Sequence, residues 1–169
     1  MPLTSEIVPF DKDWKKRFSA EKSRLETVFS FDAAEIHHVG STTVEGIAAK
    51  PEIDILVVVD ERKLPSDWVD SLAELGYVQG SDLSIGHRYF RRDVENVRMQ
   101  KLHVCREGHS EAARMIRFRD LLRSDALLKE QYEKLKLKLE KENTRGIGEY
   151  LDGKAPFVNQ ALIEKDVAT

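Results

Sequence analysis

The stretch PEIDILVVVD, residues 51–60, places two carboxylates, Glu52 and Asp54, at the start of an apolar run. Side chains alternate along a strand, so the two carboxylates face the same way, about 7 Å apart. Carboxylates placed in this way repel each other and lose solvation when they are buried, and a divalent cation removes both problems. Oxygen ligands suit Mg²⁺, which usually takes one or two carboxylates together with substrate phosphates. The stretch therefore predicts a magnesium site on Asp54 and Glu52.

A turn of small residues, Gly40-Ser41-Thr42-Thr43, precedes this acidic pair, with ten residues between Ser41 and Glu52. Glycine lets a backbone approach a ligand closely, and the N–H groups at the start of a following helix favour anions. We therefore expect Gly40, Ser41 and Thr42 to bind the phosphates of a nucleoside triphosphate whose metal lies on Asp54. Two alternatives remain: the turn is only a connection, and Glu52 is a solvated residue on a half-exposed strand.

Two basic residues elsewhere in the chain are further candidates for phosphate contacts. Arg88 and the arginines that follow it would form a phosphate-binding edge, although a charged edge strand more often serves to prevent aggregation. Lys154 follows Gly153 and would contact a triphosphate, and the alternative is that this pair is only a loop that enters a helix. Both residues are kept as candidate nucleotide-binding residues.

The elements that must position these residues are indicated by periodicity and by turn residues. Strands cluster in the middle of the chain and helices follow them, which predicts an α+β fold of one domain over residues 1–169. Its core would span about residues 30–105 and its helical part about residues 110–165. The expected strands are 35–40, 52–59, 87–92 and 96–104, and the expected helices are 10–29, 41–49 after a turn, 66–75, 110–123, 125–143 and 155–165.

Composition excludes several classes of protein. The 169 residues are 41% hydrophobic and 34% charged, with a formal net charge of −3, so no overall basic field favours a nucleic-acid or membrane partner. No apolar run approaches the roughly 18 residues of a membrane span. The single cysteine, Cys105, excludes an intramolecular disulfide and fits a reducing compartment. We expect a soluble cytoplasmic protein whose partner is a nucleoside triphosphate or another phosphorylated small molecule.

Val39-Gly40-Ser41, followed by Glu52-Ile53-Asp54-Ile55, resembles the signature of the nucleotidyltransferase superfamily in order and in spacing. Over nearly its whole length the chain resembles the GrpB-like family within that superfamily. The stretches that carry this likeness are an early helix with Trp14 and Phe18, HVGSTTVEGIAAKPEIDI, Arg88-Tyr89-Phe90, Leu102-His103-Val104, Phe118-Arg119-Asp120 and Gly153-Lys154-Ala155-Pro156-Phe157-Val158. The resemblance implies a nucleotidyltransferase-like mixed sheet flanked by helices, with C-terminal helices.

The resemblance also implies a reaction, and one departure bears on it. The superfamily's third carboxylate, which typically serves as base from a later strand, has no clear counterpart, and the matching strand carries His103. The implied enzyme transfers a nucleotidyl group from a Mg²⁺–nucleoside triphosphate to an acceptor, with Asp54 and His103 as catalytic residues. A histidine base predicts an ionisation near about pH 6.5. The alternative is a binding module of the same fold that has lost catalysis.

Overall fold

The computed structural model describes residues 3, 5–30 and 33–167, and its centre is a mixed five-stranded sheet. The strands are β1 (Ala34–Val39), β2 (Ile53–Val59), β3 (Val78–Gln79), β4 (His87–Val94) and β5 (Val97–Arg106), in the spatial order β1-β2-β5-β4-β3. Only β2 and β5 pair in parallel, and every other pair of neighbours is antiparallel. The α+β prediction, with a mixed sheet, is confirmed.

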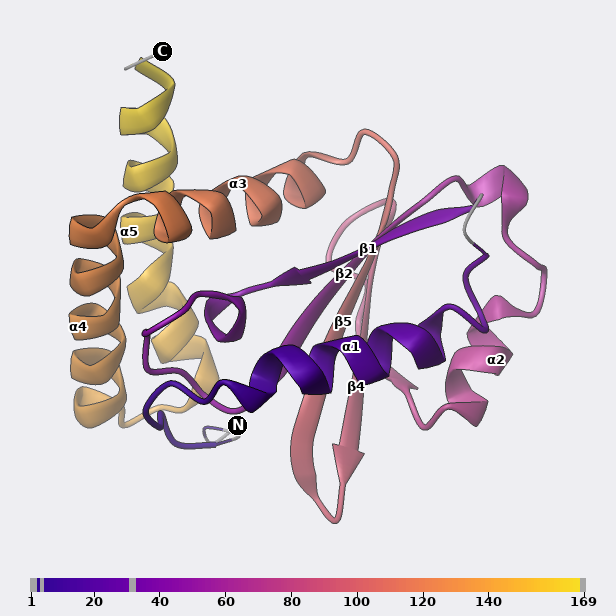
Figure 1. Ribbon diagram of the computed structural model, residues 1–169, viewed down its shortest axis with the longest axis horizontal. Coiled ribbons are helices and arrows are strands. Elements are labelled where there is room, and N and C mark those ends of the chain that lie inside the picture. The colour runs from indigo at the N-terminus through magenta and orange to yellow at the C-terminus, as the bar shows by residue number, and fades with distance from the viewer. Residues whose placement is uncertain (1–2, 4, 31–32, 168–169) are drawn as a thin grey trace.

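Helices cover both faces of the sheet. The helices are α1 (Asp13–Leu25), α2 (Trp68–Glu74), α3 (Ser110–Ser124), α4 (Ala126–Glu142) and α5 (Ile147–Val167), and two short 3-10 helices are η1 (Ser41–Thr43) and η2 (Glu61–Lys63). In Figure 1, α1 crosses the sheet in front, while α4 and α5 lie side by side beyond its left end. The helical C-terminal part thus forms a wall beside the strands that carry the predicted site.

Alternation along β2 divides its side chains between two apolar layers. Ile53, Ile55 and Val57 are fully buried in the layer that also contains Trp14 of α1 and Leu72 of α2. On the other face, Leu56 packs in a layer with Cys105, Ala112 and Met115. Asp54 shares the face of Leu56 because its neighbours in the strand face α1. The run of β-branched residues is therefore a strand buried on both faces, with one carboxylate at its start.

A third apolar cluster fixes the C-terminal helices to the turn after β1. Val44 and Ile47 are fully buried there against Leu122 of α3 and Tyr132 of α4, and Phe157 of α5 packs at the edge. This cluster is what holds the helical wall at a set distance from the Gly40 turn.

Two predicted helices are wrong in extent. Residues 41–49 contain only the three-residue helix η1, so the turn has no long helix whose N-terminus could attract an anion. The last helix starts at Ile147, well before residue 155, and includes both Gly153 and Pro156. Packing explains the second error, because α5 packs against α4, and Gly153 lies at this contact, next to Leu139.

Candidate functional site

The register between β2 and β5 brings a lysine against the acidic pair. Asp54 is the direct partner of Lys101 in this parallel pairing, so their side chains leave the same face of the sheet. Lys101 Nζ lies 3.1 Å from Asp54 Oδ1 and 3.3 Å from Glu52 Oε2. The prediction that the two carboxylates face the same way is confirmed, and one ammonium group joins them.

Glu52 is deeply buried for a carboxylate. Its side chain is 2% exposed, and the Ser5 hydroxyl donates a hydrogen bond of 2.6 Å to Oε1. A buried carboxylate needs such compensation, since its hydration is lost. The alternative of a solvated Glu52 on a half-exposed strand is therefore wrong.

The Gly40 turn packs directly on Asp54. Gly40 has φ +75° and ψ −171°, a conformation that is essentially restricted to glycine, and an added Cβ would lie 2.5 Å from Asp54 Oδ2. Beyond it, Ser41 and Tyr132 of α4 line the same cavity, and Thr42 Oγ1 lies 2.9 Å from His38 Nε2. The small residues therefore allow the turn to pack closely against the acidic pair.

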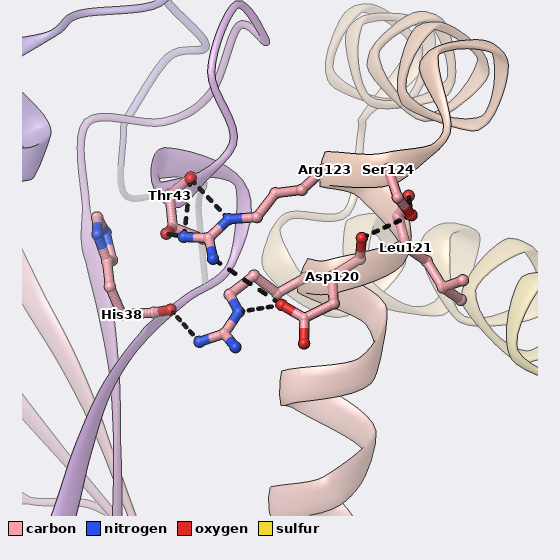
Figure 2. A network of polar contacts seen from close by, with 7 residues as sticks. His38, Thr43, Asp120, Leu121, Arg123 and Ser124 are labelled. Atoms are coloured by element: carbon pink, nitrogen blue, oxygen red, sulfur yellow. Dashed lines mark hydrogen bonds and ion pairs between the residues drawn. The ribbon is translucent and has the colours of Figure 1, made fainter.

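Helix α3 holds this turn from outside, through its arginines. The Arg123 guanidinium donates to the Thr43 carbonyl at 3.3 Å and also bonds the Thr43 hydroxyl, and Figure 2 shows this side chain reaching across from the helix. Arg119 Nη1 donates to the His38 carbonyl at 3.2 Å, and Asp120 pairs with both arginines. The two bonded carbonyls lie on either side of Gly40 and Ser41, so the backbone of the turn is fixed at both ends.

A cavity of about 470 Å³ lies between this sheet face and the C-terminal helices. The turn and the acidic pair form one side, and α4 and α5 form another. Its charged lining consists of two carboxylates, Glu52 and Asp54, and five cationic side chains, Lys50, Arg98, Lys101, Lys136 and Lys154. The cavity is therefore rich in positive charge, although the whole chain has a net charge of −3.

Three lysines of the cavity lie next to the rings of two tyrosines. Lys50 Nζ and Lys154 Nζ lie 4.5 Å and 4.7 Å from the centroid of the Tyr150 ring. Lys136 Nζ donates to the Ala48 carbonyl at 2.5 Å and lies 5.2 Å from the Tyr132 ring centroid. Within the described part of the chain, the buried Lys50 Nζ has no hydrogen-bond acceptor. An unsatisfied buried ammonium group facing a cavity favours an anionic ligand there.

Burial and mutual repulsion lower the pKa values of two of these lysines. Burial, reinforced by Lys154, lowers the pKa of Lys136 to about 7. Burial also lowers the pKa of Lys154 to about 8, with Lys101 the next largest cause. A bound polyanion would reverse both shifts, because negative charge favours the protonated form.

His103 lines the same cavity but is paired with a second histidine. Its Nδ1 lies 2.9 Å from His87 Nε2, and its ring stands 5.3 Å from the ring of Tyr89. Burial lowers the pKa of His103 to about 4, although the Asp54 charge acts in the opposite direction. The expected ionisation near pH 6.5 is therefore wrong, and this imidazole is neutral at neutral pH.

The cavity unites most of the predicted site residues. It is lined by Gly40, Ser41, Thr42, Glu52, Asp54, His103 and Lys154. Arg88 is not among them: its side chain leaves the opposite face of the sheet, with Cζ 5.3 Å from the Trp68 ring centroid. Lys154 does not lie in a loop, since α5 carries it inward to the cavity.

Sequence reasoning missed Lys50, Lys101 and Lys136. The signal for Lys101 was present, because alternation along the strand puts it on the same face as His103. Lys136 was missed because the charges along its helix alternate in sign, and this pattern predicts a helix exposed to solvent.

The acidic pair does not fit a metal ion that bridges both carboxylates as the side chains stand. Such an ion would take the position between Glu52 and Asp54 that the Lys101 ammonium occupies. The number of carboxylates is not the obstacle, because magnesium usually takes one or two of them and completes its shell with waters and substrate phosphates. The magnesium site on Glu52 and Asp54 stays a prediction, with Lys101 as its competitor.

A second group of potential metal ligands lies next to His103, on its side away from Asp54. The ligand atoms of His87, Cys105 and His109 all lie within 4.8 Å of one another. His109 Nδ1 accepts a hydrogen bond from the Glu111 N–H, and its Nε2 lies 3.1 Å from Ser84 Oγ. Both nitrogens of His109 are therefore engaged in holding the start of α3.

Comparison with known proteins identifies the family of this chain. A family profile described as GrpB protein matches residues 4–164. The chain belongs to the GrpB family. The glutamate-rich protein GrpB of Alkalihalophilus pseudofirmus is 35% identical over 163 residues, which cover 94% of each chain. The crystal structure of the conserved protein GrpB from Enterococcus faecalis superposes with a TM-score of 0.82 at 27% identity, covering 94% of this chain and 96% of that one.

A more distant likeness concerns the fold of this GrpB protein. A structure of the Cid1 poly(U) polymerase with Mg 3′-dATP bound gives a TM-score of 0.56 at 15% identity, covering 87% of this chain and 49% of that one. The nucleotidyltransferase-like fold is thereby confirmed. Among the described helices, none is both long enough and apolar enough to cross a membrane.

Proposed function

We propose that the cavity binds the phosphates of a nucleoside triphosphate, or of a related phosphorylated small molecule. The observation that carries this proposal is the group of five cationic side chains facing two carboxylates in a chain of net negative charge. Clustered ammonium groups in a partly dry cavity repel each other, and an anion is the ligand that relieves this repulsion. The fold shared with a polymerase that holds Mg 3′-dATP supports a nucleotide as the carrier of the phosphates.

The proposed orientation follows from the two sides of the cavity. The phosphates would contact Lys50, Lys136 and Lys154, and the Gly40 turn would approach them with its backbone. Thr42 would support the turn through its hydrogen bond with His38. Asp54 would then lie beside the phosphate chain, where a metal ion carried by the nucleotide would meet it.

Nucleotidyl transfer is the second candidate function, and His103 favours it. An acceptor hydroxyl would attack the α-phosphorus, the bond to pyrophosphate would break, and the hydroxyl proton would pass to the imidazole. Burial keeps His103 neutral, so it is able to take that proton near pH 7, although a pKa of about 4 makes it a weak base. Lys101, which stands opposite Asp54 on β5, favours instead a module that binds without catalysis.

Calorimetric titration with a panel of nucleoside mono-, di- and triphosphates, with and without Mg²⁺, tests the binding proposal. We expect affinity to rise with the number of phosphates. Lys154→Met should weaken triphosphate binding by about 10- to 100-fold, because a charge-assisted hydrogen bond contributes about 1.5–3 kcal/mol. Lys138→Met, on the exposed side of α4, is the matched control and should bind as the wild type does.

Absence of binding by every triphosphate, including inorganic triphosphate, would overturn the proposal. An equal loss in both lysine variants would show that general charge, and not this cavity, attracts the ligand. Pyrophosphate release with candidate acceptors then separates the two functions, since a binding module releases none.

A further inference from the structure

We propose that Lys101 is the resident cation of the Glu52–Asp54 pair and takes the place of a divalent ion bridging the two carboxylates. The wild-type protein should therefore bind phosphates without a metal ion between these side chains. The expectation about phosphate binding rests on the proposed function. The preference of the acidic pair for an ammonium group over a metal ion does not.

The backbone fixes the position of Lys101. It lies in the middle of β5, a ten-residue strand paired on both sides, and faces Asp54 in the register. Neighbouring strands in a sheet lie about 4.7–4.9 Å apart, so paired residues on one face are close neighbours. The side chain therefore reaches the acidic pair from a rigid element.

The oxygens of the two carboxylates have nearby groups in the structure. Glu52 Oε1 accepts from the Ser5 hydroxyl, and Glu52 Oε2 and Asp54 Oδ1 both face the Lys101 ammonium. Asp54 Oδ2 faces Gly40 so closely that no Cβ would fit between them. A bridging ion would have to displace Lys101 before it could reach both carboxylates.

The charge on Lys101 is held in place by the same pair. Burial acts to lower its pKa, but Asp54 and then Glu52 outweigh burial and hold the pKa of Lys101 above its usual range. Lys136 and Lys154 in the same cavity have lowered pKa values, so Lys101 differs from them in role. Two carboxylates and one ammonium group leave a single negative charge, which a buried site tolerates better than two.

The test is a titration with Mn²⁺ followed by electron paramagnetic resonance, in which bound ion loses the sharp signal of free ion. No nucleotide is present. We expect wild-type protein and Lys101→Arg to bind Mn²⁺ weakly at this site, and Lys101→Met to bind it at least about tenfold more tightly. Adding Glu52→Gln to Lys101→Met should remove the gain, and Lys138→Met should show none.

Equal Mn²⁺ affinity in the wild type and in Lys101→Met would overturn the proposal. Lys101→Gln keeps hydrogen bonds to the carboxylates and serves as the second neutral variant if Lys101→Met does not fold. Tight Mn²⁺ binding by the wild type, abolished by Glu52→Gln, would overturn it without any Lys101 variant. Since nucleotides take no part, failure here and failure of nucleotide binding are separate results.

Discussion

The hydrogen side chain of Gly40 leaves space for the carboxylate of Asp54. Its backbone conformation and the 2.5 Å between a hypothetical Cβ and Asp54 Oδ2 both require glycine at this position. The nearest atom belongs to a residue that is itself held by Lys101, so Asp54 has little freedom to move away.

Gly40→Ala should therefore destabilise the protein by about 1–3 kcal/mol through backbone strain, with displacement of Asp54 in addition. Urea unfolding measures this loss, and triphosphate titration should show weaker binding. Gly108→Ala is the control, since Gly108 also has a positive φ, +78°, but a Cβ there meets nothing within 4 Å, so this variant should show the backbone strain without the contact. If both variants unfold alike, the contact with Asp54 has no energetic importance.

At the residue scale, the sequence predicted best those site residues that lie close to one another along the chain. Gly40, Ser41 and Asp54 lie close together in the chain, and their types and spacing predicted one shared nucleotide site; the structure places all three on one cavity. Lys101 was not among the predicted site residues, because its position beside Asp54 depends on a parallel pairing between distant strands. Arg88 was misplaced because its face of the strand was not determined by the residues around it.

Among the elements, α3 has a role that its sequence did not reveal. Its arginines look like a solvated helix face, yet Arg119 and Arg123 bond the carbonyls of His38 and Thr43 on either side of the Gly40 turn. The helix thus stabilises the shape of the turn, and Asp120 orients both guanidinium groups.

Arg123→Gln should weaken triphosphate binding by about three- to tenfold, because each lost hydrogen bond contributes about 0.5–1.5 kcal/mol to the position of the turn. The change in stability should be small, since the Arg123 side chain is 45% exposed. Arg114→Gln, on the same helix but directed to Asn159 of α5, is the control for loss of charge. Unchanged affinity in Arg123→Gln, measured by calorimetry, would show that the turn keeps its shape without this contact.

The length of α5 shows where element prediction failed. Gly153 and Pro156 both lower helix propensity, so the local sequence indicated a loop followed by a shorter helix. The observed helix is set by tertiary packing against α4, which the local sequence does not encode. Strands were predicted more accurately because β-branched runs and the turn at Glu95 and Asn96, which have φ 51° and 63°, carry their own signals.

For the whole molecule, the proposed phosphate binding would be coupled to the uptake of protons by the cavity. Lys136 and Lys154 have pKa values of about 7 and about 8 in the free protein, so both are partly neutral near pH 8. A bound polyanion would raise both pKa values, so protons would be taken up from solution on binding. Affinity should therefore increase as the pH falls from about 9 to about 7, which is the direction expected for lysines with lowered pKa values.

Calorimetry in buffers with different heats of ionisation measures this uptake directly. At pH 8 we expect net uptake of protons per triphosphate bound, and the double variant Lys136→Met with Lys154→Met should lose most of it. Triphosphate ionisation also contributes, so inorganic triphosphate titrated into the double variant gives the baseline. Release of protons by the wild type at this pH would contradict the assigned pKa directions.

The contact between Gly40 and Asp54 also has an evolutionary consequence. A side chain at position 40 and a carboxylate at position 54 compete for one volume, so neither position can change freely while the other is kept. Homologous chains that retain the aspartate should retain the glycine, and chains that have lost the glycine should carry a smaller residue at position 54. In an alignment of many GrpB sequences, the two positions should vary as a single unit, and lineages that abandoned this site should have lost both residues together.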